Sequence, residues 1–196
     1  MAYLILVVLW VLFYVLHSLF ASMNIKRKFK GWLGTAFKWY RLLYSIFATF
    51  FFLAIMIYAG QIPHLQLFAS NESTTYFGFL ITGLGTIILV KSFKYVGLGS
   101  FIGTSPEHEG SEVLVRDGIH GAIRHPMYLG TILIFLGYFI YQPYMSSLIH
   151  LLMLLLYLPI GIYLEEKKLV ILFGKKYEQY REEVPMLIPW TKKKGT

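Results

Sequence analysis

Long apolar runs recur along the whole of this chain, and each is about as long as a lipid bilayer is thick. The first run, residues 3–22, contains no Asp, Glu, Lys or Arg, and a helix of about 20 residues crosses the roughly 30 Å of hydrocarbon in a membrane. The later runs are residues 40–59, 76–90, 126–141 and 144–164. The run that begins at residue 76 extends to residue 96 if Lys91 and Lys94 reach back to the lipid headgroups. We therefore predict an all-α integral membrane protein of five transmembrane helices.

The composition agrees with a membrane protein and excludes several soluble classes. Hydrophobic residues make up 57% of the chain and charged residues only 14%, whereas about 25% of an ordinary soluble domain is charged. The first run has no basic segment before it, unlike a signal peptide, so we expect it to stay in the mature protein. Since Cys is absent, disulfides, thiolate zinc sites and a catalytic cysteine are excluded. We expect no metal centre.

The basic residues are confined to three parts of the chain. All 18 Lys and Arg lie in residues 26–41, 91–124 and 167–194. Five helices that cross the membrane in alternation put these segments on one side, which the positive-inside rule identifies as the cytoplasm. We therefore predict that the N-terminus is outside and the C-terminus is cytoplasmic. The net charge of +8 then reflects topology, and we expect the lipid bilayer as a partner and no nucleic acid.

Two cytoplasmic segments are predicted to do more than connect helices. Residues 97–125 form a Gly-rich loop that is far longer than the median connection, and such loops are usually functional or disordered. After residue 164 the last helix is expected to leave the membrane and continue, with Gly174 as a kink, because apolar residues recur there at helical spacing. Gln142 and Pro143 indicate a tight helical hairpin. The single membrane domain, 1–196, thus comprises three spans (1–96), the loop (97–125), the hairpin (126–164) and a cytoplasmic C-terminal segment (165–196).

Histidines within the predicted spans raise the question of a haem or metal site. His17 lies near the inner end of the first span and His150 near the outer end of the fifth, a separation of roughly 12 Å along the membrane normal. They cannot share one iron without a large tilt, so a packed or pore-side histidine is the better account of each. A dinucleotide site also fails, because Ile102 stands where the glycine-rich motif needs its third Gly.

A polar group surrounds the start of the fourth predicted helix. Arg124, His125 and Tyr128 place a cation, an imidazole and a phenol around the first turn. Pro126 suits the first helical position. The free N–H groups and the positive dipole end at this point favour a carboxylate or phosphate. The alternative is that Arg124 and His125 are interfacial anchors that reach into the headgroups.

Two carboxylates, Glu165 and Glu166, lie at the inner end of the fifth predicted helix. The hairpin brings them to the same membrane level as Arg124 and His125. A structural salt bridge accounts for one carboxylate, whereas a second indicates a site with convergent polar groups. An amphoteric ligand fits this arrangement, with its carboxylate toward the helix N-terminus and its amine toward Glu. An amino acid that bears a nucleoside has this chemistry.

These residues give the chain a resemblance to the isoprenylcysteine carboxyl methyltransferase family and its bacterial relatives, integral membrane enzymes that use S-adenosylmethionine. The resemblance covers roughly residues 110–189. It rests on Leu114, Val115, Gly118, the run 124–128, Gly130, Glu165, Glu166, Phe173, Gly174, Tyr177, Tyr180, Val184, Pro185 and Pro189. The front half, including residues 17–22 and 40–44, is similar to a bacterial branch that includes methanethiol S-methyltransferases and proteins linked to nitrite and nitric oxide metabolism. This resemblance implies the bacterial inner membrane, with the active site at the cytoplasmic face.

The resemblance also implies a set of cofactor-binding residues. They are Leu114, Val115, Gly118, His120, His125, Pro126, Met127, Tyr128 and Glu165. Leu114 and Val115 would contact the cofactor from the loop, and Glu165 would hold its polar end. The chain departs from the family at two positions: His120 stands where the family often has Tyr, and Gly161 stands where the carboxyl methyltransferases carry a substrate-binding Arg. Recognition of a prenylcysteine carboxylate is therefore not expected.

The function predicted from these residues is S-adenosylmethionine-dependent methyl transfer to a small or lipophilic acceptor, specifically a thiol. The reaction is an in-line displacement, to which the protein contributes positioning and exclusion of water. Arg124, Glu166 and His120 are the residues expected to take part in catalysis, the last two as bases if the acceptor is a hydroxyl or an amine. The alternatives are an isoprenylcysteine-type carboxyl methyltransferase, a non-enzymatic membrane accessory protein and a nicotinamide-dependent reductase of related fold.

Overall fold

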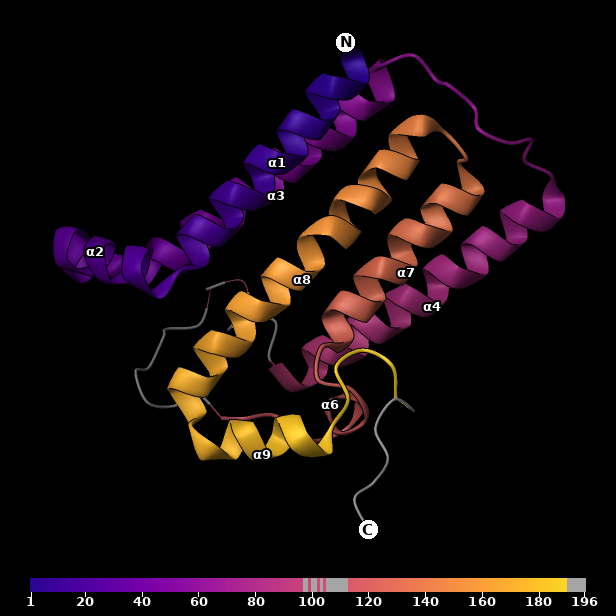
Figure 1. The fold of residues 1–196 in the computed structure, drawn as a ribbon. Helices are drawn as coiled ribbons and strands as arrows, with labels where there is room; N and C mark the ends of the chain where they lie inside the picture. The colour runs from indigo at the N-terminus through magenta and orange to yellow at the C-terminus, as the bar shows by residue number, and fades with distance from the viewer. Residues whose placement is uncertain (97–98, 100–101, 103, 105–112, 190–196) are drawn as a thin grey trace.

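The computed structural model describes residues 1–96, 99, 102, 104 and 113–189, and throughout this part the regular elements are helices (Figure 1). The elements are α1 (Ala2–Ala21), α2 (Met23–Leu33), η1 (Gly34–Trp39), α3 (Tyr40–Gln61), α4 (Glu72–Val96), α6 (Ile119–Ala122), α7 (Pro126–Tyr141), α8 (Met145–Phe173) and α9 (Lys175–Glu183). Most of the first half of the predicted functional loop, and the basic residues after 189, lie outside the described residues.

The predicted apolar helices are present, with ends close to those expected from the sequence. Four stretches are long and apolar enough to cross a membrane: Ala2–Ala21, Met23–Gln61, Glu72–Lys94 and Met145–Phe173. The helix α7 is apolar but has only 16 residues, a rise of about 24 Å. The prediction of an all-α membrane protein is therefore confirmed at the level of four helices of spanning length and one shorter apolar helix.

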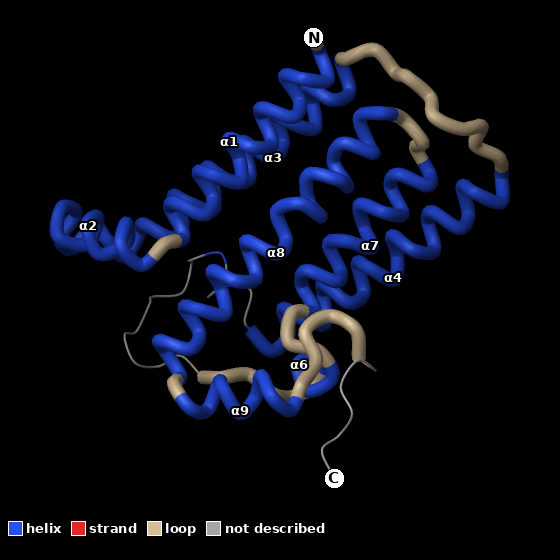
Figure 2. The backbone as a smooth tube through the Cα atoms, viewed as in Figure 1, coloured by secondary structure: helices blue, strands red, loops and turns tan. Residues whose placement is uncertain are grey.

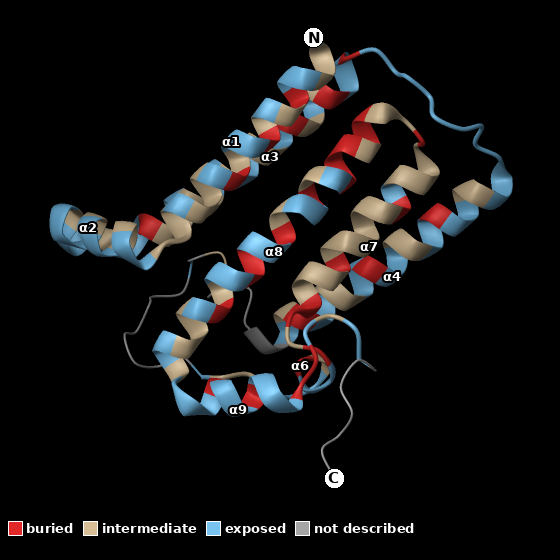
Figure 3. Cartoon of the chain, in the orientation of Figure 1, coloured by how far each residue is buried: buried red, intermediate tan, exposed pale blue. Residues whose placement is uncertain are grey.

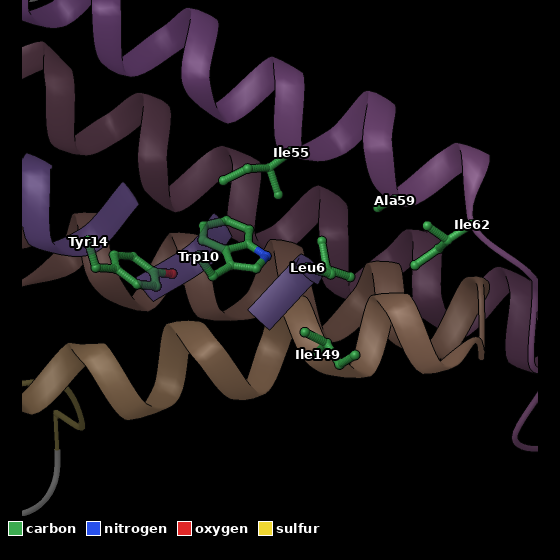
Figure 4. Close-up of a cluster of buried hydrophobic side chains, with 7 residues drawn as sticks. All are labelled: Leu6, Trp10, Tyr14, Ile55, Ala59, Ile62 and Ile149. Carbon is green, nitrogen blue, oxygen red and sulfur yellow. The ribbon is translucent and has the colours of Figure 1, made fainter. Parts of the chain in front are cut away.

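The main apolar core lies where α1 packs between α3 and α8. Its buried side chains are Leu6, Trp10, Tyr14, Ile55, Ala59, Ile62 and Ile149 (Figure 4). The outward surfaces of α1 and α3 expose many large apolar side chains (Figure 3). Exposed apolar surface on this scale is costly in water, whereas lipid tails solvate it. The helices therefore have the surface of a membrane bundle.

A glycine seam joins α4 to α7. A Cβ atom added at Gly85 would lie 2.7 Å from the carbonyl oxygen of Gly130, and one added at Gly78 would lie 2.8 Å from that of Gly137. These separations are shorter than real Cβ atoms adopt, so only glycine allows the two backbones to approach so closely. Small residues are commonly used in this way between membrane helices, where packing rather than hydrophobic burial drives association. The glycine seam fixes α7 against α4.

A short connection at Gln142 and Pro143 joins α7 to α8. The amide of Leu67 donates to the carbonyl of Pro143 at 2.8 Å, and the amide of Met145 donates to Leu65 at 2.9 Å. The connection from α3 to α4 is thus tied to the hairpin tip. These bonds hold the end of the bundle that is opposite to the charged residues of α8.

Beyond residue 164 the chain stays helical, as α8 runs to Phe173 and α9 follows it. The chain turns at Gly174, whose φ of 55° is positive. The helix α9 then leads away from the axis of α8 (Figure 2). Glycine tolerates a positive φ without the steric cost that other residues meet. Tyr177, Tyr180 and Val184 bury their side chains together, with Leu114 packed against them. The helix α9 therefore packs at the end of the bundle that is opposite to the tip of the α7–α8 hairpin.

Candidate functional site

The site is built around the start of α7. Pro126 occupies the first turn, and the amides of Arg124 and His125 donate to the carbonyls of Pro185 and Met186 at 2.9 and 3.1 Å. Proline is well suited to this position because its missing N–H would have no partner in the helix. The segment after α9 therefore runs beside the residues that enter α7, and it fixes their direction.

Arg124 connects three elements through its guanidinium group. Its Nε and Nη2 donate to Oε1 of Glu166 at 2.9 and 2.7 Å, and its Nη1 donates to the carbonyls of Arg181 and Val184 at 3.0 and 2.6 Å. Only 6% of the side chain is exposed. A buried cation with this set of acceptors joins α7, α8 and the end of α9.

Glu166 is the carboxylate that forms the structural salt bridge. Besides Arg124, it contacts Nε2 of His125 at 3.2 Å and Nη1 of Arg181 at 3.8 Å. Its side chain is 12% exposed. The sequence alone indicates a salt bridge for one of the two glutamates and does not distinguish between them. The structure places Glu166 in it.

Glu165 is more accessible than its neighbour, with 43% of its side chain exposed. Nδ1 of His125 lies 3.5 Å from one of its carboxylate oxygens, and the phenol of Tyr128 also interacts with it. His125 is itself buried, and its ring contacts both carboxylates, one through each ring nitrogen. Glu165 can accept a cationic ligand that Glu166, already engaged by two arginines, has less room to bind.

We call the group formed by Arg124, His125, Glu165 and Glu166 the corner. His120 lies in the single helical turn of α6 and interacts with three of these residues, Arg124, His125 and Glu165. Gly118, with φ of 59°, starts that turn. The carbonyl of His120 accepts the hydroxyl of Tyr180 at 2.6 Å, whereas its Nε2 is buried and has no hydrogen-bond partner among the described residues. Burial lowers the pKa of His120 and raises the pKa of Tyr180 to about 12. The imidazole is thus held neutral near pH 7, with one ring nitrogen unpaired.

The strap of residues 113–118 connects this corner to α9. Leu114 packs against the tyrosines of α9, and Val115 is half-buried. Arg116 forms a salt bridge with Glu183 and lies over the ring of Tyr180, with 5.3 Å from the guanidinium carbon to the ring centroid. Leu114 and Val115 are therefore anchored close to α9. Their predicted contact with a cofactor stays a prediction.

The structure therefore brings together most of the predicted site residues. Arg124, His125 and both glutamates meet directly, and Tyr128 contacts Glu165. Arg181, which no sequence motif indicated, also belongs to this group, because its carbonyl accepts from Arg124 and its side chain lies 3.8 Å from Glu166. No group of three or more His, Asp or Glu side chains suited to a metal occurs within the described residues.

The two histidines of the predicted spans each pair with a side chain of a neighbouring helix. Nδ1 of His150 accepts the indole N–H of Trp10 at 2.8 Å. His17 pairs instead with the hydroxyl of Tyr44, which lies 2.7 Å from its Nδ1. The histidines thus have separate partners on different helices.

A family model and several proteins of known name are similar to this chain. The family model described as phospholipid methyltransferase matches residues 73–176. The methanethiol S-methyltransferase of Crocosphaera subtropica is 30% identical over 210 residues, which cover 94% of this chain and 73% of that protein. Methanethiol S-methyltransferase 1 of Bradyrhizobium diazoefficiens is 27% identical over 93% of this chain and 65% of its own length.

A eukaryotic relative matches a smaller part of the chain. The protein-S-isoprenylcysteine O-methyltransferase of Schizosaccharomyces pombe is 30% identical over 126 residues, which cover 57% of this chain and 53% of that protein. No solved structure matches the chain.

Proposed function

This chain belongs to the phospholipid methyltransferase family, and from that membership we propose that it transfers a methyl group from S-adenosylmethionine to a small or lipophilic thiol. The observation that carries the proposal is the accessible carboxylate of Glu165 beside His125 and the start of α7. The family membership supports methyl transfer, and the polar corner supports an amphoteric methyl donor.

The residues of this corner fit the cofactor group by group. The first turn of α7 offers N–H groups to a carboxylate, and Glu165 offers an acceptor to an ammonium group. The unpaired Nε2 of His120 and the apolar side chains of Leu114 and Val115 suit a nucleoside. When bound, the cofactor supplies an electrophilic methyl group on a positively charged sulfur. Arg124 and Glu166 then act by fixing α7 to α8 and α9.

The proposed topology has five membrane spans, with α7 as the fourth and shortest. Since α7 and α8 form a hairpin with its tip at Gln142 and Pro143, an α8 that crosses the membrane returns the chain to the side from which α7 began. The basic residues then all face the cytoplasm. This places the corner at the cytoplasmic face of the inner membrane, in contact with a water-soluble cofactor.

A thiol acceptor is supported by the surroundings of Gly161. A Cβ atom at this position would lie 3.0 Å from Cε1 of Tyr157, so an aromatic ring covers the place where the carboxyl methyltransferases carry a cation. A carboxylate brought near the hydrocarbon without a cationic partner is costly. Two methanethiol S-methyltransferases also match more than 90% of the chain, whereas the isoprenylcysteine enzyme matches 57% of it.

Purified protein in lipid nanodiscs provides the test. With methyl-labelled S-adenosylmethionine, we expect transfer to methanethiol or a longer alkyl thiol to be faster than transfer to acetylated farnesylcysteine or to a phospholipid amine. Faster methylation of farnesylcysteine would mean that the acceptor group is a carboxylate and not a thiol. Binding of a nicotinamide cofactor in place of S-adenosylmethionine would favour a reductase, and binding of neither would favour an accessory protein.

A further inference from the structure

A group of polar side chains lies inside the apolar bundle, apart from the corner described above. His17 and Tyr44 pair at 2.7 Å between α1 and α3, and the hydroxyls of Ser18 and Tyr157 lie 2.9 Å apart between α1 and α8. None of the four side chains is fully buried. Polar groups in membrane-spanning helices are costly and usually functional. We call these four residues the inner polar cluster.

The inner polar cluster borders the proposed cofactor corner. Tyr128, which contacts Glu165, also interacts electrostatically with Tyr157 and Tyr44. Tyr157 precedes Glu165 on α8 by eight residues, a rise of about 12 Å along the helix. Tyr128 therefore interacts both with the accessible carboxylate and with two members of the inner polar cluster. A ligand between them would meet the cofactor corner on the cytoplasmic side and hydroxyl groups on the membrane side.

Tyr157 is held in a defined orientation. Its ring stacks on that of Tyr14, with 4.1 Å between centroids and 9° between planes, and it lies beside Gly161, where an added Cβ atom would come within 3.0 Å of its Cε1. The hydroxyl is therefore aimed at Ser18 and away from the helix that carries it. Ring stacking of this kind fixes the direction of the hydroxyl and needs no charged group beside it.

We propose that the inner polar cluster is the binding site for the methyl acceptor, and that His17 accepts the proton of its thiol. This inference rests on the proposed function and deepens it. The acceptor is a small neutral thiol that enters from the bilayer. The hydroxyls of Tyr44 and Tyr157 orient its sulfur, and His17 lies beside Tyr44 as the base.

The reaction balances with one base. The S–H proton passes to the neutral imidazole of His17, directly or through the hydroxyl of Tyr44. The acceptor sulfur forms a C–S bond with the methyl group, and the bond from that methyl to the sulfonium sulfur breaks with its electron pair left on sulfur. The products are a methyl thioether, S-adenosylhomocysteine and an imidazolium, which releases its proton toward the cytoplasm.

His17 is the strongest base in the cluster, because phenols and a serine hydroxyl accept protons far less readily near pH 7. Two charged groups act on the cluster: Glu165 interacts with Tyr157, and Arg41 interacts with Tyr44. Arg41 favours a negative charge on the acceptor sulfur, and so does the sulfonium.

Two variants and two matched controls test the proposal. His17→Gln removes the base, and Tyr44→Phe removes the hydroxyl that contacts it. His150→Gln changes the other intramembrane histidine, which pairs with Trp10, and Tyr58→Phe removes a phenol of the same helix, whose hydroxyl donates to Ala2 at 3.1 Å. The controls thus repeat each chemical change away from the inner polar cluster.

The first readout is binding of butanethiol to the full-length protein without cofactor, by titration calorimetry in nanodiscs. We expect saturable binding to wild type and to both controls, weakened at least fivefold in Tyr44→Phe. Absence of saturable binding to the folded wild type, or equal affinities in all four variants, would overturn the acceptor site.

The second readout separates a base from a merely structural residue. An aryl thiol ionises at lower pH than an alkyl thiol, so it needs less help in losing its proton. His17→Gln is expected to slow methylation of butanethiol at least tenfold and that of thiophenol less than threefold. Equal slowing of both would overturn the role of His17.

Failure of the proposed function gives a different pattern. If wild type binds butanethiol but neither binds S-adenosylmethionine nor methylates any acceptor, the reaction is wrong while the thiol site stands. If wild type methylates a thiol that does not compete with butanethiol, and its variants bind the cofactor normally, the reaction stands and the inner polar cluster is excluded as the acceptor site.

Discussion

At the scale of single residues, two adjacent glutamates of α8 have different environments. Glu166 is enclosed by Arg124, His125 and Arg181, whereas Glu165 is 43% exposed and contacts His125 from the other side. Successive residues of a helix point in directions about 100° apart, so they face different partners. The sequence identified the pair as a candidate site, but it could not assign the roles, because these depend on where the segment after α9 returns.

The first prediction concerns that division of roles. Glu165→Gln is expected to weaken S-adenosylmethionine binding at least tenfold, about 1.4 kcal/mol, and His125→Ala to do the same. Glu166→Gln instead leaves Arg124 buried without its carboxylate, a loss of roughly 3–5 kcal/mol of stability. Calorimetry and thermal unfolding in detergent measure the two effects. Unchanged affinity in folded Glu165→Gln and His125→Ala would return both residues to a structural role.

A second prediction follows from His120, whose pKa is lowered by burial. The unfolded chain takes up a proton at this residue as the pH falls below about 6.5, whereas the folded chain resists it. The neutral ring therefore contributes stability above pH 6.5 that is lost as the pH falls through the folded pKa. Between pH 7.5 and 5.5 the wild type should lose more thermal stability than His120→Tyr. An equal loss in both would exclude His120 as a source of the pH dependence.

At the scale of elements, the sequence predicted most helix ends but few helix contacts. The helices α3 and α7 begin at the predicted residues 40 and 126, because polar or proline-containing segments interrupt the apolar runs there. Pairing was not predictable, since a helix that is apolar all round gives no stripe that marks its packing face. The glycine seam of α4 and α7 carries that information through the size of its residues.

A third prediction tests the glycine seam. Gly85→Leu would place a side chain against Gly130 and push the backbones apart, which is expected to destabilise the fold by about 1–3 kcal/mol. Gly83→Leu is the matched control on the same helix, since a Cβ there meets nothing within 4 Å. Unfolding temperatures in detergent compare the two. Equal stability of both variants would mean that α4 and α7 pack elsewhere.

At the scale of the whole molecule, the distribution of charge predicts orientation, while the site depends on tertiary structure. The basic segments at residues 26–41, 91–124 and 167–194 can be assigned to one side from the sequence alone. The Arg124–Glu166 pair spans 42 positions and was placed by the hairpin. The hydrogen bonds from Arg124 to the carbonyls of Arg181 and Val184 span 57 and 60 positions, and no local sequence pattern predicts them.

The fourth prediction is that Glu72 faces outside, whereas Lys26, Arg116 and Lys193 face the cytoplasm; the last of these lies outside the described residues. The chain has no Cys, so single cysteines can be introduced at these positions without a background. A membrane-impermeant maleimide should label Glu72→Cys in intact cells and the other three only after permeabilisation. The reverse pattern would invert the topology.

The hydrogen bonds from Arg124 and His125 to Pro185 and Met186 imply that the helices insert into the membrane before the corner forms. All the apolar helices can enter the membrane before residue 186 has left the ribosome, but the entrance to α7 is not fixed until then. Newly inserted chains therefore pass through a stage in which the bundle is present and the corner is not. A chain stopped after residue 183 should insert normally and fail to bind S-adenosylmethionine, as labelling and calorimetry would show; tight binding by that chain would mean that the corner forms earlier.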